Sequence, residues 1–198
     1  MCGRYVIFTG DEFEEMQRIV AEVEKKYGLG SVSTGEIFPT NSAPVFVAQE
    51  GQVGAELMTW GFPKYQGSGV IINARAETAA EKRTFSASLR SRRCVIPTTG
   101  FFEWRQGENA GQKEKFLFRL PDVSMVYLAG LYIEGRGPEK GRYVILTTGA
   151  NSSMQPYHHR MPLVLHKDSL REWVFDSGFA MEYLQKMPPE LAAQKAEI

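Results

Sequence analysis

The chain has 198 residues, of which 43% are hydrophobic and 12% aromatic, enough for one domain with a sizeable core. Charged residues make up 23% of the sequence, which excludes a mostly disordered chain. Its 23 basic and 23 acidic side chains cancel, so bulk charge gives no argument for nucleic-acid binding. Residues 61–120 nevertheless hold 11 basic and 5 acidic side chains. Such a local excess either binds phosphates or forms a solvated helix face.

Cellular location and cofactors are inferred from patterns that the sequence lacks. No apolar run approaches the roughly 20 residues that span a bilayer, and the first residues carry no apolar secretory segment. Two cysteines, Cys2 and Cys94, build no disulfide framework. The metal-binding patterns CxxC and HExxH and the glycine-rich phosphate loops are missing as well. We therefore expect a soluble, cytoplasmic, monomeric protein with no membrane contact, no metal and no cofactor.

An amphipathic helix is expected near the start of the chain. Apolar residues recur at spacings of three and four across residues 13–27, the pattern of a helix with one buried face. Thr9 and Glu12 have the spacing of a capping box, and Gly28 suits the position just after the helix end.

Short strand-like runs separated by turn residues follow this helix. Residues 44–49 and 53–60 predict a hairpin around 50–52, and residues 77–90 predict a helix. Further strands are expected at 70–74, 93–97, 100–105, 116–120, 125–133, 142–148 and 163–166, and further helices at 169–175 and 179–187.

The order of these elements predicts one α+β domain with a mixed, largely antiparallel, barrel-like sheet flanked by helices. We find no internal repeat and no linker. The core is expected to span about residues 2–187, and the polar tail from Pro188 is expected to be a terminal helix or frayed.

Cys2 is the most informative residue of the sequence. Removal of Met1 would leave Cys2 with a free α-amine beside its thiol, and an α-amine has a far lower pKa than a lysine. Such an aminothiol attacks an aldehyde twice: the amine forms an imine, and the thiol then closes a five-membered thiazolidine. An incidental cysteine at a loose terminus is the alternative. The strand-like run 3–8 favours a terminus that is held.

Four other residues combine reactive side chains with apolar surroundings. Cys94 lies in an apolar strand and is expected to be an inert core residue. Glu103 lies among aromatic residues that raise a carboxyl pKa, or it is an exposed strand residue. Asn73 ends an apolar run, where asparagine is most often a turn former. His158 precedes His159 in a stiff proline-flanked loop, where a capping role is the alternative to catalysis.

Six segments of the chain form an ordered pattern: Met1-Cys2-Gly3-Arg4, Asn41-Ser42-Ala43-Pro44, Trp60-Gly61-Phe62, Ile72-Asn73-Ala74-Arg75-Ala76-Glu77-Thr78, Gly100-Phe101-Phe102-Glu103-Trp104 and His158-His159-Arg160-Met161-Pro162-Leu163-Val164-Leu165. Together they resemble the SOS response-associated peptidase (SRAP) family, whose members process abasic sites and cross-link themselves to DNA. Each is weak alone, but six in register over residues 2 to about 175 are specific.

The resemblance implies a role for each of four residues. Cys2 would form a thiazolidine with the ring-opened sugar of an abasic site in single-stranded DNA, and would also remove N-terminal residues by self-cleavage. Asn73 would hold the Cys2 amine and the sugar, Glu103 would act as acid and base, and His158 would handle the imine and its reversal.

The resemblance also implies a set of DNA contacts and a setting. Phosphate contacts fall on Arg4, Arg75, Arg83 and Arg160, and a backbone contact falls on Pro44. An abasic site offers no base to read, so binding rests on backbone charge and on stacking of neighbouring bases. The aromatic residues available for stacking are Trp60, Phe62, Tyr65, Phe85 and Trp104. The implied partners are abasic single-stranded DNA and replication-fork DNA, with association to the nucleoid.

Two segments depart from the family pattern. Val45-Phe46 stands where the family more often has a polar pair, which leaves the neighbouring DNA contact open. The tail after Pro188 lacks the usual closing segment, which leaves the last piece of the sheet open.

Two other functions remain as alternatives. N-terminal-nucleophile glutamine amidotransferases also begin Met-Cys-Gly, but their Arg-Gly-Pro-Asp-like motif follows the first strands. Here Arg136-Gly137-Pro138-Glu139 comes far downstream. A non-catalytic single-stranded DNA-binding module would use the basic stretch and the aromatic residues, but it leaves Cys2 unexplained.

Overall fold

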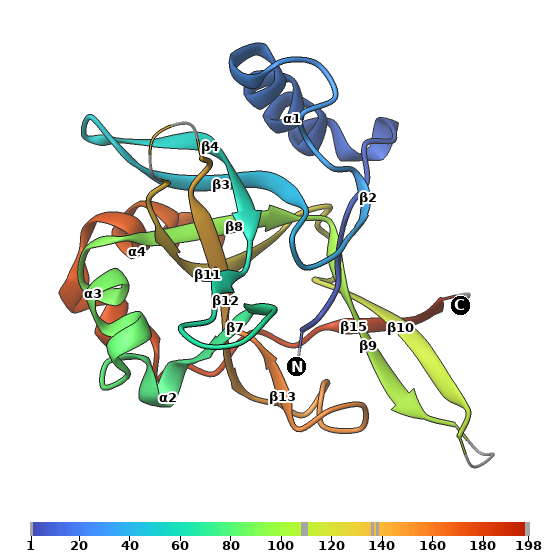
Figure 1. The fold of residues 1–198 in the computed structure, drawn as a ribbon. Coiled ribbons are helices and arrows are strands. Elements are labelled where there is room, and N and C mark those ends of the chain that lie inside the picture. The colour runs from blue at the N-terminus through green and yellow to red at the C-terminus, as the bar shows by residue number, and fades with distance from the viewer. Residues whose placement is uncertain (1, 108–110, 136, 138, 197–198) are drawn as a thin grey trace.

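The structure is a computed structural model that describes residues 2–107, 111–135, 137 and 139–196. It holds two large sheets, with the helices packed on the outside of the larger one (Figure 1). No helix within these residues is long and apolar enough to cross a membrane.

The larger sheet closes into a ring of five strands. Its members are β3 (Ser42–Gln49), β4 (Gln52–Trp60), β8 (Arg93–Thr98), β11 (Val126–Ile133) and β12 (Arg142–Gly149). Strand β12 pairs with both β4 and β11, which closes the ring. The short strands β7 (Asn73–Arg75), β13 (Arg160–Pro162) and β14 (Val164–Leu165) extend it. Within this sheet only β12–β4 and β12–β7 are parallel, so the expected largely antiparallel barrel is confirmed.

The predicted hairpin is present as β3 and β4. Gln49 pairs with Gln52 across a two-residue turn in which Glu50 and Gly51 have φ of 45° and 79°. Two successive positive φ values are the geometry of a type I′ turn, which suits the twist of the paired strands.

The second sheet joins the two ends of the chain. Its order is β15-β10-β9-β1-β2, with β1 at Tyr5–Ile7, β2 at Gly35–Ile37, β9 at Gly100–Gln106, β10 at Lys113–Arg119 and β15 at Ala192–Ala196. In Figure 1 the β9–β10 hairpin projects away from the ring, with the red β15 beside it. A small third sheet pairs β5 (Phe62–Pro63) with β6 (Val70–Ile71).

The expectation of a helical or frayed tail is wrong. Strand β15 pairs with β10 over five residues, from Ala192 opposite Arg119 to Ala196 opposite Lys115. The alanine-rich tail has little strand propensity of its own. Strand β10 would otherwise leave an unpaired edge, so tertiary pairing decides the conformation of the tail.

The first helix, α1 (Glu14–Tyr27), follows the 3₁₀ turn η1 (Asp11–Phe13). The predicted capping box is wrong, because no side chain among the described residues caps the start of either element. Gly28 does end the helix: its φ is 100° and its N–H donates to the Glu24 carbonyl at 2.8 Å.

The remaining helices are shorter than expected. Residues 77–90 form α2 (Ala76–Ala79) and α3 (Arg83–Ser91), separated by an extended Lys82. After the 3₁₀ turn η2 (Lys167–Ser169) come α4 (Leu170–Phe175) and α5 (Ser177–Tyr183). Asp176 is extended between them and its carboxylate accepts from the Phe179 N–H at 3.0 Å, which caps α5.

The basic side chains of residues 82–93 lie partly on the surface and partly in the core. Lys82, Arg83 and Arg90 are exposed, whereas Arg93 is only 3% exposed. The Arg93 guanidinium donates to four backbone carbonyls at the ends of α3 and α4. Arg93 therefore joins helices to the ring and is not available to a phosphate. Cys94, next to it, lies in the core as expected.

Candidate functional site

Cys2 lies in the interior, just before β1. Its N-terminal segment runs beside β9, where Tyr5 pairs with Phe101 and the Phe102 N–H donates to the Arg4 carbonyl at 2.9 Å. Cys2 has no exposed surface. Burial raises the pKa of its thiol, and the charge of Glu103 raises that pKa further. The thiol is therefore protonated at neutral pH and needs a base to become a nucleophile.

Asn73 holds the backbone of Cys2. It begins β7, which runs parallel to β12, and its Nδ2 donates to the Cys2 carbonyl at 2.9 Å. Its Oδ1 is buried and accepts no hydrogen bond from the described residues. Asn73 therefore bridges two segments of the chain and is not a simple turn former. An unsatisfied buried acceptor is rare enough to require an explanation.

Glu103 is buried in β9 with 4% of its surface exposed. Side chains alternate along this strand: Phe101 enters the core, while Phe102 and Trp104 lie together on the other face, with 6.5 Å between their ring centroids. The alternative of an exposed strand glutamate is therefore excluded. The Glu103 charge acts on both the Cys2 thiol and the His158 imidazole.

His158 lies in the loop between β12 and β13. Its Nδ1 lies 2.9 Å from the Arg160 nitrogen and 3.1 Å from the Arg160 carbonyl oxygen, so the tautomer of the ring decides which of these two groups it pairs with. Burial lowers the pKa of His158, while the charge of Glu103 opposes that shift. The neutral imidazole is thus favoured, and it can accept a proton. His159 stacks on His158 at 4.4 Å between ring centroids.

The turn that carries His158 has supports that the sequence analysis missed. The Asn151 Oδ1 accepts from the Met154 N–H at 3.2 Å, and its Nδ2 donates to the carbonyls of Pro188 and Pro189. The Tyr157 ring packs edge-on against Phe116 at 4.7 Å. An asparagine at the start of a Ser-Ser segment is a turn signal that could have identified Asn151.

Two of the expected phosphate ligands form ion pairs with carboxylates of the same chain. Arg4 pairs with Glu36 at 2.9 Å, and its guanidinium lies over the Trp104 ring at 4.9 Å. Arg160 makes two bonds to Glu77, of 2.6 and 2.9 Å. Sequence reasoning did not identify the carboxylates of Glu36 and Glu77 as partners of these arginines.

The other two expected phosphate ligands are exposed. Arg75 ends β7, immediately after Asn73 and Ala74, and Arg83 begins α3. Neither makes an ion pair within the residues that the structure describes.

Three residues expected to contact DNA are instead in the interior. Trp60 is fully buried, and its indole N–H donates to the Ile72 carbonyl at 3.0 Å, one residue before Asn73. Phe62 is 2% exposed, and Pro44 is buried in β3. Trp60 and Phe62 belong to the main core, whereas Pro44 pairs with Leu57, which packs in a smaller apolar cluster with Val23 of α1. Burial keeps these three side chains away from DNA in this structure.

The remaining aromatic residues differ in accessibility. Tyr65 is 98% exposed in the loop between β5 and β6. Trp104 is partly buried against Arg4. Phe85 is partly buried and packs on Phe62 at 6.2 Å. Tyr65 is therefore the member of the set with the freest ring.

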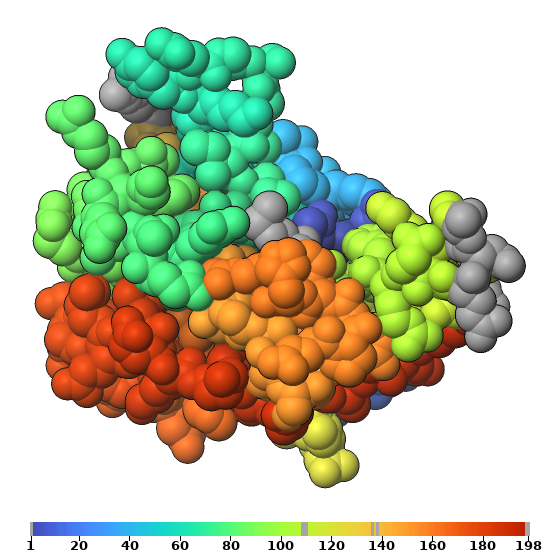
Figure 2. Space-filling model, turned by 90° about the horizontal axis from the view of Figure 1, so that it is seen from below, coloured from blue at the N-terminus to red at the C-terminus, as the bar shows by residue number. Residues whose placement is uncertain are grey.

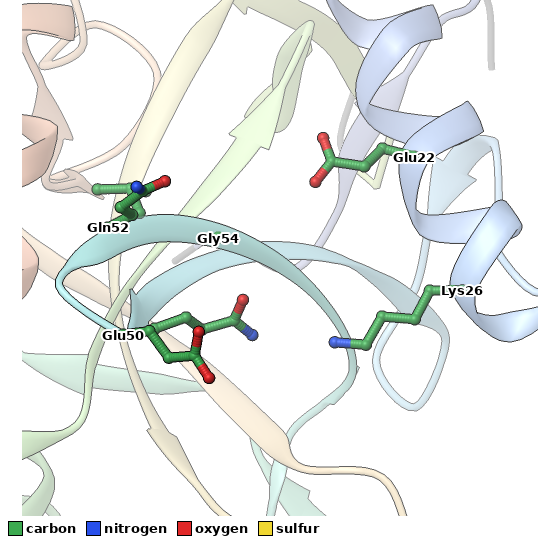
Figure 3. Close-up of a pocket in the computed structure, with 7 residues that line it drawn as sticks. Glu22, Lys26, Glu50, Gln52 and Gly54 are labelled. Carbon is green, nitrogen blue, oxygen red and sulfur yellow. The ribbon is translucent and has the colours of Figure 1, made fainter.

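Seen from below, the blue N-terminal segment lies between the yellow-green β9–β10 hairpin and the orange loop before β13 (Figure 2). A groove of about 690 Å³ lies elsewhere, between α1 and the β3–β4 hairpin, where Glu22, Lys26 and Glu50 line it (Figure 3). The described residues hold no group of three or more His, Cys, Asp or Glu side chains that could bind a metal.

Comparison with known proteins finds relatives over most of the chain. The chain is 30% identical over 204 residues to abasic site processing protein YoqW of Bacillus subtilis (strain 168), covering 94% of this chain and 86% of that protein. It is 26% identical over 180 residues to abasic site processing protein YedK of Escherichia coli (strain K12), covering 88% and 79%.

Solved structures share the fold. A crystal structure of a protein from Bacteroides thetaiotaomicron superposes with a TM-score of 0.79 at 21% identity, covering 99% of this chain and 92% of that one. The family model described as SOS response associated peptidase (SRAP) matches residues 1–197. The chain therefore belongs to the SRAP family.

Proposed function

We propose that this protein processes abasic sites by cross-linking itself to them through Cys2. The observation that carries the proposal is the convergence of Cys2, Asn73 and Glu103 in one buried place, with His158 in electrostatic contact with Glu103. The names of the relatives YoqW and YedK support the same substrate. We propose single-stranded DNA, including DNA at replication forks, as the natural partner of a monomeric, nucleoid-associated protein.

The chemistry requires Met1 to be removed, and we propose that the Cys2 thiol removes it by self-cleavage. The α-amine of Cys2 then adds to the aldehyde carbon of the ring-opened sugar and expels water, giving an imine. The thiol adds to the same carbon: a C–S bond forms, the C=N double bond becomes single, and the thiol proton ends on nitrogen. The five-membered thiazolidine forms readily because both nucleophiles belong to one residue.

Three neighbouring side chains assist these steps. Asn73 holds the Cys2 carbonyl and offers its buried Oδ1 to the new α-amine. Glu103 donates a proton to the sugar ring oxygen as the ring opens and takes protons from the attacking groups. His158, neutral because burial lowers its pKa, handles the proton of the imine nitrogen and its reversal.

The surrounding cations bind the DNA backbone and so shield the lesion. Arg75 and Arg83 are exposed and bind phosphates directly. Arg4 and Arg160 reach a phosphate in competition with Glu36 and Glu77. Tyr65 stacks on a base beside the lesion.

Intact mass tests the proposal most directly. The purified protein is weighed before and after mixing with single-stranded DNA that carries one abasic site. We expect a starting mass short by Met1, then a heat-stable one-to-one adduct that is lost in Cys2→Ala. The adduct should form more slowly in Glu103→Gln. A processed terminus without an adduct would refute the cross-link.

The same variants separate the alternatives. A glutamine amidotransferase would release ammonia from glutamine and lose that activity in Cys2→Ala. A non-catalytic binding module would bind single-stranded DNA equally well with and without Cys2, and would form no adduct.

A further inference from the structure

The carboxylate of Glu36 joins two cations from two other parts of the chain. Its Oε2 accepts from Arg4 Nη1 at 2.9 Å, and its Oε1 accepts from Lys115 Nζ. Because each cation uses a different oxygen, either bond can break while the other remains. The three residues come from β2, the segment before β1, and β10, and we call them the Glu36 bridge.

The three side chains of the Glu36 bridge differ in solvent exposure. The side chain of Lys115 is 6% exposed, whereas those of Glu36 and Arg4 are 32% and 29% exposed. The Lys115 ammonium lies 4.3 Å from the centre of the Phe102 ring, which is a cation–π contact. Lys115 is therefore out of reach of DNA, whereas Arg4 and Glu36 are both partly exposed to solvent, and Arg4 is the exposed cation of the three.

Arg4 is oriented by rings on two sides. Its guanidinium carbon is 4.3 Å from the centre of the Phe38 ring and 4.9 Å from that of Trp104. One amino group of the guanidinium, Nη1, donates to Glu36. An arginine carries five N–H donors, so the rest of that edge remains for a phosphate.

The net charge of the Glu36 bridge suggests why Lys115 is buried there. An arginine paired with one carboxylate is neutral, and a phosphate must compete with that carboxylate. With Lys115 present the bridge carries a charge of +1. Glu36 then keeps a cation when Arg4 turns to a phosphate, which avoids a half-buried carboxylate left without a partner.

We propose that Lys115 is a positioning residue for DNA binding: it neutralises Glu36 and so makes Arg4 available to a backbone phosphate. Phosphate, Arg4, Glu36 and Lys115 then form a row of alternating charges. The inference rests on the proposed function only in taking Arg4 as a phosphate ligand. It does not require the cross-link.

A double-mutant cycle tests this inference. The dissociation constant for an unmodified single-stranded oligonucleotide, which cannot be cross-linked, is measured by fluorescence anisotropy at low salt. The proteins are wild type, Lys115→Met, Glu36→Gln and the double variant. We expect Lys115→Met to weaken binding about tenfold in the wild-type background and less than twofold in the Glu36→Gln background.

Two further variants complete the design. Lys26→Met removes an equal charge from the ion pair with Glu56 in the groove of Figure 3, and it should change the dissociation constant less than twofold. Lys115→Gln keeps a hydrogen-bond donor for Glu36 without the charge, and it should resemble Lys115→Met. It replaces Lys115→Met if thermal melting shows that the methionine variant is unfolded.

The outcomes are distinct. An equal loss in both backgrounds would overturn the inference, because a lysine that touched DNA or acted at long range would not depend on Glu36. Unchanged binding in Lys115→Met and Lys115→Gln would also overturn it. Wild type that binds the oligonucleotide but forms no adduct with abasic DNA would refute the proposed function alone. Absence of any binding would refute both.

Discussion

At the scale of single residues, the side-chain amide of Asn73 uses its nitrogen in a hydrogen bond and leaves its oxygen unsatisfied. Its Nδ2 holds the Cys2 carbonyl, while its buried Oδ1 accepts nothing from the described residues. A buried acceptor without a donor costs about 1–3 kcal/mol. Under the proposed function, the free α-amine of a processed Cys2 donates a hydrogen bond to this oxygen. That bond offsets the cost of burying the Asn73 Oδ1.

Asn73→Leu keeps the size of the side chain and removes both polar groups. We expect adduct formation with abasic DNA to slow by about tenfold or more, because the aminothiol loses its orientation. Single-turnover kinetics measure the effect. Affinity for unmodified DNA should stay near that of wild type, and an unchanged rate would show that Asn73 does not position Cys2.

The His158–Glu103 pair makes a prediction about titration. Burial lowers the pKa of His158 and the Glu103 charge raises it, so Glu103→Gln should lower that pKa further. Proton NMR of the imidazole ring measures the shift, and Glu114→Gln, which removes a carboxylate from the ion pair with Arg105, should leave it unchanged. A higher pKa in Glu103→Gln would contradict the assigned contact.

The same shift has a consequence for stability. Because the pKa of His158 is lower in the folded than in the unfolded protein, its imidazole is neutral in both states well above pH 6.5. As the pH falls below about 6.5, the unfolded chain takes up the proton first and the folded protein loses stability. His158→Gln should remove this part of the pH dependence in urea titrations.

At the scale of elements, Arg93 of β8 forms hydrogen bonds with the ends of two helices and so fixes them beside this strand. Its guanidinium donates to the carbonyls of Trp173 and Val174 and to those of Leu89 and Arg90. Carbonyls at helix ends have no partner within the helix, so one buried side chain replaces several caps.

Arg93→Met should therefore destabilise the fold by about 3 kcal/mol, because it leaves buried carbonyls without donors. Urea denaturation measures the change. Arg90→Met, an exposed neighbour in α3, should change stability by less than about 0.5 kcal/mol. Equal effects of the two variants would mean that the buried bonds contribute nothing specific.

The elements that sequence patterns predicted are those with strong local signals. The helix over 13–27 and the hairpin around Glu50-Gly51 carry their periodicity and turn chemistry within a few residues. Strand β15 carries no such signal, since its pairing with β10 depends on an edge far away in sequence. The break at Lys82 was equally invisible, because the residues on both sides favour a helix.

The same division holds for the site. Cys2, Asn73, Glu103 and His158 were singled out because each is a reactive side chain in apolar surroundings or matches a family motif. Trp60 and Pro44 match motifs too, yet they are buried. A motif marks that a residue matters but does not distinguish a contact with DNA from a contact with the core. The partners Glu36 and Glu77 needed three-dimensional proximity.

At the scale of the whole molecule, the first and last strands belong to one sheet. Strand β1 lies between β2 and β9, and β15 covers the outer edge of β10. Asn151 ties the start of the final segment to the turn that carries His158, through the Pro188 and Pro189 carbonyls.

Removal of residues 191–198 should destabilise the protein by at least about 2 kcal/mol, since it takes away the buried Leu191 and five paired residues. The exposed edge of β10 should also promote self-association, which size-exclusion chromatography detects. Lys195→Ala, which removes an exposed ion pair but no pairing, should stay monomeric with nearly wild-type stability.

The complete burial of Cys2 sets an order of events during biosynthesis. The Cys2 side chain has no exposed surface, and the segment that follows it pairs with β9 at Tyr5 and Val6. Under the proposed function, a separate trimming enzyme therefore acts most easily before Gly100–Gln106 is synthesised and docked. Self-cleavage by the Cys2 thiol, as proposed above, would serve molecules that fold first.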